Sequence, residues 1–85
     1  MNEGAEQNQQ YSINFDIVGK NKDKIKEKLT SFGVEVTRLR DNGDGDTQIW
    51  LRGEADKIKL ALKWALRGYG ENVKDYFEKF AKKTR

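Results

Sequence analysis

Lysine residues are concentrated in one short segment of this 85-residue chain. Between positions 20 and 28, five lysines stand beside only two acids, Asp23 and Glu27, so this segment alone carries +3, the same as the whole chain. The five are Lys20, Lys22, Lys24, Lys26 and Lys28. Phosphate contacts supply most of the affinity for nucleic acid that is independent of base sequence, so the cluster favours a polyanionic ligand. The alternative is a solvated helix face, since lysines at alternate positions of a helix cannot all point one way.

A second group of candidate residues, Arg38, Arg40, Trp50 and Arg52, lies in the middle of the chain. Exposed arginine side chains can pair with phosphate and also stack on bases. A tryptophan beside an arginine can act as a stacking platform or as the anchor of a protein contact. Trp50 therefore has both interpretations, and a third in which another part of the chain shields it.

The composition argues against most catalytic chemistry. The chain has no His and no Cys, which removes imidazole and thiolate ligands, thiolate nucleophiles and serine triads that depend on histidine. An enzyme would have to use carboxylates, Lys, Arg, Tyr or hydroxyl groups alone. We therefore expect a binding module with no catalytic residue, no cofactor and no metal.

The segment DNGDGD from Asp41 to Asp46 invites a calcium interpretation, because carboxylate oxygens are hard ligands. Its spacing does not fit the twelve-residue calcium loop. Gly43 and Gly45 fall where ligands are needed, and Arg52 replaces the terminal glutamate. The segment is better explained as a turn.

Alternating apolar residues from Tyr11 to Ile17 predict a first strand, and apolar residues at helical spacing predict a helix over 21–32 that ends at Gly33. Residues 34–40 and 47–52 predict a β-hairpin around the DNGDGD turn. Val34 and Val36 share a strand face with Arg38 and Arg40, so we expect a bulge, or an early end of the strand, before Leu39 joins the core.

Two further helices are predicted after the hairpin. The first is anchored by apolar residues at helical spacing, namely Ile58, Ala61, Leu62, Ala65 and Leu66. Leu60 and Trp64 form a second stripe on this helix, and we expect the last helix to cover it with the apolar face that begins at Val73. The fold class is therefore α+β, with a three-stranded antiparallel sheet, three helices on one face and the order β-α-β-β-α-α.

The length permits one domain with a small core. We expect residues 1–10 to form a disordered tail and residues 11–85 a single domain. The chain has no apolar run long enough to span a membrane and its first residues do not resemble a signal peptide, so we expect a soluble cytoplasmic protein.

The segment IVGKNKDKIKEKLTSFGVEV, from Ile17 to Val36, resembles the core of the KH domain, a module that binds single-stranded nucleic acid. An apolar strand end leads to a loop of G-x-x-G type, then to Ile25, and eight residues later to Gly33. Downstream, IWLRGEADKIKLALKWAL resembles the last strand and helix of a minimal type I KH domain. The resemblance covers about Tyr11 to Leu66.

In the KH family, the glycine loop lets phosphates approach the backbone at a helix N-terminus. The resemblance implies a groove with phosphates on the side of the loop Gly19, Lys20, Asn21 and Lys22, Ile25 and Val36 in the floor, and Arg38 or Arg40 on the opposite rim. Here the loop reads GKNK, so Lys22 replaces the second glycine. Its side chain either blocks the backbone or substitutes a charge for backbone contact, and degenerate loops in this family often accompany a protein-binding role.

Two functions follow from these residues. The first is binding of single-stranded RNA or DNA through Gly19, Lys20, Asn21, Lys22, Lys26, Arg38 and Arg40. The second is a protein-interaction module with a KH-like fold, which binds a partner or forms a homodimer through Trp50 and Arg52 or through the last helix. An acylphosphatase-like enzyme has a similar element order, but it needs an arginine after the first strand, and no arginine precedes Arg38.

Overall fold

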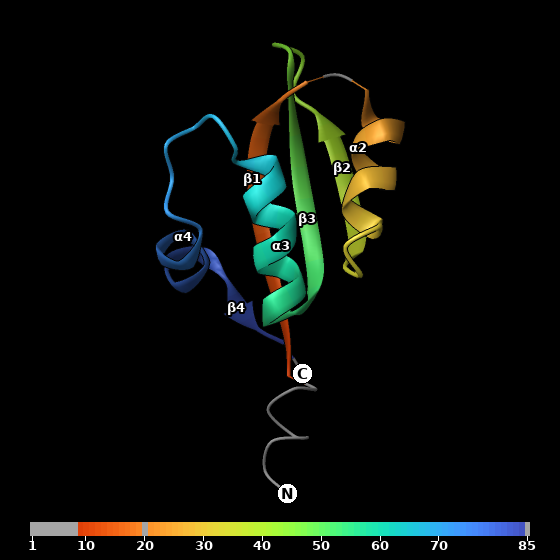
Figure 1. Cartoon of the computed structure of the whole chain (residues 1–85). Coiled ribbons are helices and arrows are strands. Elements are labelled where there is room, and N and C mark those ends of the chain that lie inside the picture. The colour runs from red at the N-terminus through yellow and green to blue at the C-terminus, as the bar shows by residue number, and fades with distance from the viewer. Residues whose placement is uncertain (1–8, 20, 85) are drawn as a thin grey trace, which may run out of the picture.

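The computed structural model describes residues 9–19 and 21–84. Within these ranges the chain forms four strands and three helices (Figure 1). In chain order they are β1 (Gln10–Val18), α2 (Lys22–Thr30), β2 (Glu35–Asp41), β3 (Asp46–Glu54), α3 (Ala55–Ala65), α4 (Val73–Phe80) and β4 (Lys82–Lys83).

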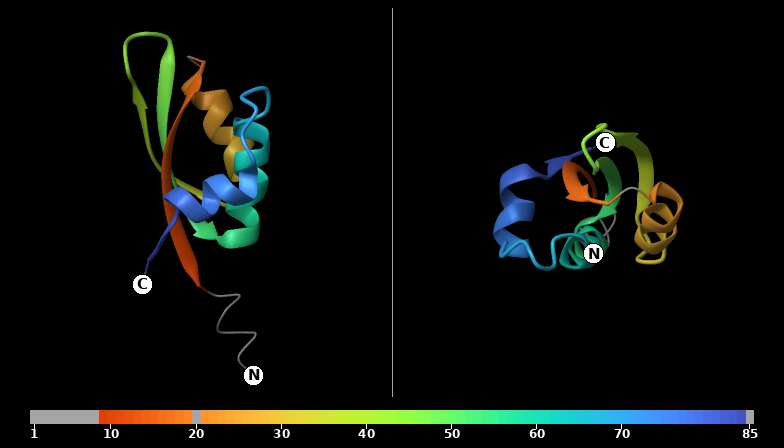
Figure 2. Two further views of the ribbon diagram at one scale, coloured as in Figure 1. Left: turned by 90° about the vertical axis from the view of Figure 1, so that its left-hand side faces the viewer. Right: turned by 90° about the horizontal axis from the view of Figure 1, so that it is seen from above.

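The strands form one antiparallel sheet in the order β2-β3-β1-β4. Helices α2 and α3 cover one face of this sheet, whereas α4 lies alongside at the β1 edge and leads into β4 (Figure 2). Apart from the additional helix α4, the β-α-β-β-α-β order is that of the split β-α-β arrangement. The α+β class is confirmed, but the fourth strand and the position of α4 at the edge differ from the prediction.

The fourth strand pairs with the free edge of β1. Helix α4 ends at Phe80, and the extended backbone of Ala81 carries Lys82 opposite Ser12 and Lys83 opposite Tyr11. The backbone N–H of Thr84 then donates to the carbonyl oxygen of Gln10 at 2.8 Å. A two-residue strand is too short to show a sequence period, so the sequence does not predict it.

The first strand is organised as its alternation predicts. Ile13, Phe15 and Ile17 are buried beneath the helices, while Asn14 and Asp16 are exposed on the opposite face, which we call the open face. The strand begins at Gln10, which the sequence placed in the tail. Gln9 of that predicted tail is also described, and residues 1–8 lie outside the described residues.

The predicted bulge is present in β2. Val36 pairs with Leu51 and Arg38 pairs with Trp50, which leaves Thr37 as the extra residue. The insertion reverses the alternation, so Val36 and Leu39 both pack against the core and Arg38 faces away from it. The turn is built as expected: Asp41 Oδ1 accepts from the Gly43 amide at 2.8 Å, and Gly43 has φ +83°.

Helix α3 buries the predicted anchors Ile58, Ala61, Leu62 and Ala65, and Leu66 is buried just beyond its end. The last helix does not cover the second stripe of α3 in full. Its Phe77 enters the main core, edge-on to Tyr11 with 5.1 Å between ring centroids, while Leu60 stays 52% exposed. Helix α4 therefore packs against both α3 and β1, but it leaves Leu60 of the second stripe exposed.

Candidate nucleic-acid interface

The first glycine of the GKNK loop is held by the hairpin. Its N–H donates to the carbonyl oxygen of Gly45 at 2.9 Å, and its own carbonyl oxygen accepts from the hydroxyl of the fully buried Thr47 at 2.6 Å. Gly19 has φ +142°, a conformation that favours glycine. The loop therefore leaves β1 along a fixed path.

Helix α2 begins directly after the loop. Asn21 caps it, because its Oδ1 accepts from the backbone N–H of Lys24 at 3.0 Å. Of the predicted phosphate-binding lysines, Lys22 and Lys26 are exposed on α2, and Lys20 lies outside the described residues. The capped helix gives the loop a positive N-terminal end.

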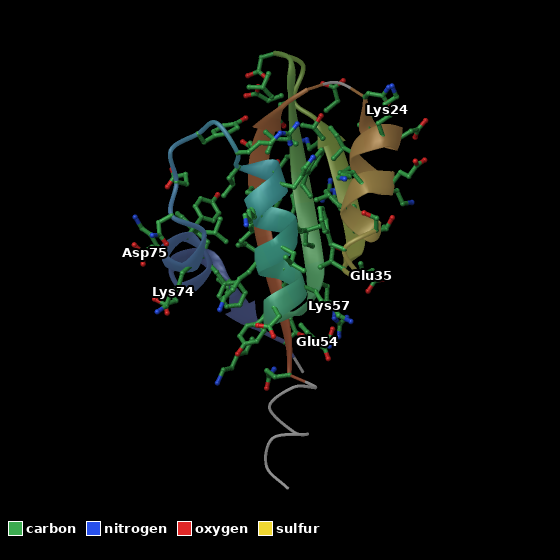
Figure 3. All side chains as sticks on the ribbon, viewed as in Figure 1. Lys24, Glu35, Glu54, Lys57, Lys74 and Asp75 are labelled. Atoms are coloured by element: carbon green, nitrogen blue, oxygen red, sulfur yellow. The ribbon has the colours of Figure 1, made fainter. Side chains whose placement is uncertain are left out.

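A cavity of about 410 Å³ lies between the loop, α2 and the end of α3. We call it the loop groove. Its apolar floor comes from Ile17, Ile25 and Ala65, which are all buried. Its remaining lining residues are Val18, Gly19, Asn21, Lys24, Trp64, Arg67 and Tyr69. The structure thus places Gly19, Asn21 and Ile25 at one site, as the sequence predicts, and Figure 3 shows Lys24 at the start of α2.

The far wall of the loop groove was missed by sequence reasoning. The Arg67 guanidinium lies 4.8 Å above the Trp64 ring, and its Nη1 donates to the Trp64 carbonyl oxygen at 2.7 Å. The Tyr69 hydroxyl accepts from the backbone N–H of Val18 at 2.7 Å, so the loop after α3 is joined to the end of β1. Trp64, Arg67 and Tyr69 stand close together in the sequence at the end of α3. Helical spacing alone does not predict that they lie beside the GKNK loop.

The charged side chains that line the loop groove are both cationic. Lys24 comes from the first turn of α2 and Arg67 from just beyond α3, and the described lining contains no carboxylate. A half-open cavity with an apolar floor and cationic rim suits a ligand that is both planar and anionic. Arg67 is held in place before any ligand arrives, which reduces the entropy lost on binding.

The structure does not bring Arg38 and Arg40 to the loop groove. They pair with Trp50 and Gln48 of β3 and lie on the open face, because Leu39 between them points to the core. Val36, expected in the groove floor, packs against the core and is not among the lining residues.

The open face gathers the second set of candidates instead. Trp50 lies under the Arg38 guanidinium at 4.8 Å, with Asn14 paired to it on the other side. Arg52 follows two residues later on the same strand face, between Ser12 and Glu35. Arg38, Arg40, Trp50 and Arg52 are therefore neighbours on one surface, which is separate from the loop groove.

Tyr76 of α4 packs against Phe80, with the ring centroids 4.6 Å apart and the ring planes tilted by 47°. Burial raises the pKa of the Tyr76 phenol, and the negative charges of Glu71 and Asp16 raise it further. The phenol is thus neutral throughout the physiological pH range.

In the DNGDGD turn, backbone amides donate hydrogen bonds to carboxylate oxygens. Asp44 Oδ1 accepts from the Asp46 amide at 3.3 Å, and Asp41 Oδ1 accepts from the Gly43 amide. Over residues 9–19 and 21–84, no three acidic, His or Cys side chains cluster closely enough to hold a metal. Within the same ranges, no helix is long and apolar enough to cross a membrane.

Comparison of the chain with protein-family models, with curated proteins and with solved structures found no match.

Proposed function

We propose that this chain is a non-catalytic module that binds single-stranded RNA or DNA in the loop groove. The observation that carries the proposal is the lining of this groove, in which an apolar floor meets Trp64 and only cationic charged side chains, Lys24 and Arg67. Bases would rest on the floor beside Trp64, and the two cations would face the phosphates.

The surroundings of the groove support the same ligand. Lys22 and Lys26 are exposed on α2 beside Lys24, so the cationic field extends beyond the cavity. Helix α2 adds the positive end of its dipole at Asn21. In this proposal the loop faces phosphates as the KH resemblance implies. Lys22 adds a positive charge at the position of the second glycine.

Charge substitutions at matched positions test the proposal. We expect Lys24→Gln and Arg67→Gln each to weaken binding of a short single-stranded oligonucleotide about three- to tenfold at low salt, because each removes one phosphate contact. Lys74→Gln is the control, since Lys74 is exposed on α4, on the opposite side of the molecule from Lys24 (Figure 3). Affinity can be measured by fluorescence anisotropy of a labelled strand. Equal effects of all three substitutions would contradict binding in the loop groove.

A protein-interaction role is the second candidate, and the exposed side of α3 favours it. Leu60 is 52% exposed and shares a shallow hollow of about 340 Å³ with Val73 of α4, with Lys59, Lys63 and Asp56 around it. An apolar centre within a charged rim is typical of a protein contact. We expect Leu60→Ser to abolish any self-association detected by light scattering and to leave oligonucleotide affinity unchanged. Self-association that survives this substitution would argue against a contact through this hollow.

A further inference from the structure

The open face of the sheet contains a second hollow, of about 270 Å³, on the side of the molecule away from α2 and α3. Two aromatic rings border it, Trp50 from the middle of β3 and Phe80 from the end of α4. The other lining residues are Ser12, Ile13, Asn14, Thr37, Leu51 and Lys82. Ile13 and Leu51 turn their side chains to the core, so the hollow is lined mainly by the two rings and by polar groups.

The Trp50 ring has different neighbours on its two sides. Arg38 of β2 is paired with it on one side and places its guanidinium 4.8 Å from the ring. Asn14 of β1 is paired with it on the other side, where the hollow lies. The cation therefore holds the tryptophan from one side and leaves the side toward Phe80 open to a ligand.

Hydrogen-bonding groups line the floor of the hollow between the rings. The Asn14 Oδ1 accepts from Gln48 Nε2 at 3.1 Å, which orients the amide and directs its NH₂ group elsewhere. Ser12 precedes Asn14 by two residues on the same strand face, and it is paired with Lys82 of β4. A planar ligand between the rings would thus meet an amide, a hydroxyl and an ammonium group at its edges.

We propose that this hollow holds one unpaired base of a single-stranded nucleic acid, stacked on Trp50 and bordered by Phe80. The Asn14 amide and the Ser12 hydroxyl contact the edge of the base, and Lys82 faces the adjoining phosphate. The site is separate from the loop groove and shares no lining residue with it. It can therefore bind whether or not the loop groove does.

The chemistry of the face favours a base over a peptide side chain. The apolar part is limited to two rings, and aromatic stacking needs little more than that. Over the whole open face the charges balance, because Arg38, Arg40, Arg52 and Lys82 are matched by Asp16, Glu35, Asp46 and Glu54. At the hollow itself the charged lining residue is Lys82, and Arg38 lies against the Trp50 ring, so the charge beside the two rings is positive and suits a phosphate next to a stacked base.

The two tryptophans allow each site to be observed separately. In Trp64→Phe, Trp50 is the remaining tryptophan, so its fluorescence reports the open face; in Trp50→Phe, Trp64 reports the loop groove. We expect oligothymidylate and oligouridylate to quench Trp50 with saturation in the Trp64→Phe protein, because a stacked base quenches the indole. A duplex of matched length should quench it far less, since its bases are already paired.

Phe80→Leu removes one ring while it keeps an apolar side chain at a position that is 44% exposed, so the fold should be retained. We expect this change to weaken the Trp50-detected binding about fivefold or more. Phe32→Leu, which makes the same change in the turn that follows α2, should leave it unaltered. Circular dichroism verifies that both variants are folded.

Several results would overturn the base site. These are the absence of Trp50 quenching by single strands at low salt, equal quenching by the duplex, or equal effects of Phe80→Leu and Phe32→Leu. Trp50 fluorescence that changes with protein concentration alone, and not with oligonucleotide, would instead identify the open face as an interface between copies of this chain. Quenching of Trp64 in the Trp50→Phe protein, with no response in the Trp64→Phe protein, would support the loop groove and refute this site.

Discussion

The direction of the GKNK loop depends on the hydroxyl of Thr47. Thr47 is fully buried, and its Oγ1 donates to the carbonyl oxygen of Gly19 at 2.6 Å. Gly19 has no side chain through which the protein could hold it, so this bond and the Gly45 bond to its amide set the direction of the loop. The first residue of the candidate site is therefore positioned by a β3 residue far away in the sequence.

Removal of this hydroxyl tests the dependence. We expect Thr47→Val, which keeps the side-chain shape, to lower the free energy of unfolding by about 1–2 kcal/mol, because it leaves the partly buried Gly19 carbonyl oxygen without its donor. Thr37→Val is the matched control: the Thr37 hydroxyl also donates to a carbonyl oxygen, that of Trp50 at 3.3 Å, but at an exposed site. Its cost should stay below about 0.5 kcal/mol. Denaturant unfolding measures both, and equal losses would refute the role of Thr47.

Strand β4 holds the segment after α4 beside the open face. It pairs with the N-terminal part of β1 and fixes the end of α4, so that Phe80 and Lys82 both reach the hollow beside Trp50. The Gln9 side chain adds a hydrogen bond of 2.7 Å from its Nε2 to the Thr84 carbonyl oxygen. Two residues of strand thus close a sheet edge that would otherwise expose unpaired backbone groups.

A chain that ends at Ala81 isolates the contribution of β4. We expect faster hydrogen exchange at the backbone amide of Ser12, which faces β4, and little change at Phe15 in the middle of β1. The same truncation should weaken the Trp50-detected binding of single strands, because Lys82 is lost and Phe80 is no longer held. Unchanged exchange at Ser12 would show that β4 does not form a stable pair.

The elements also show what periodicity predicts and what it misses. The alternation in β1, the anchors of α3 and even the β2 bulge were predictable, because each is imposed by apolar residues that must reach one core. The Arg67 stack on Trp64 and the strand at Lys82 were not, because neither has a sequence period and both depend on contacts between distant segments. Arg38 is a different case, because the bulge that reverses its side was predictable. The KH resemblance nevertheless grouped Arg38 with the GKNK loop, from which the bulge separates it.

The two candidate surfaces of the molecule lie on different sides of the sheet, one beside the loop and one on the open face. The net charge of +3 is too small to explain binding by itself, since 17 basic residues are opposed by 14 acidic ones. What favours a polyanion is the local distribution: the described lining of both sites contains cations and no carboxylate. Binding should therefore depend on a few defined cations and not on the average charge.

The dependence of affinity on salt distinguishes these two cases. For single strands, the logarithm of the binding constant falls with the logarithm of salt concentration by about 0.7 per phosphate neutralised. We expect Lys24→Gln to reduce the magnitude of this slope by about 0.7, because Lys24 faces the loop groove, and Lys74→Gln on α4 to leave it unchanged. Anisotropy titrations at several salt concentrations give the slopes. If both substitutions reduced the slope equally, the strand would be held by the general charge of the surface, and the defined cations of the loop groove would have no special part in binding.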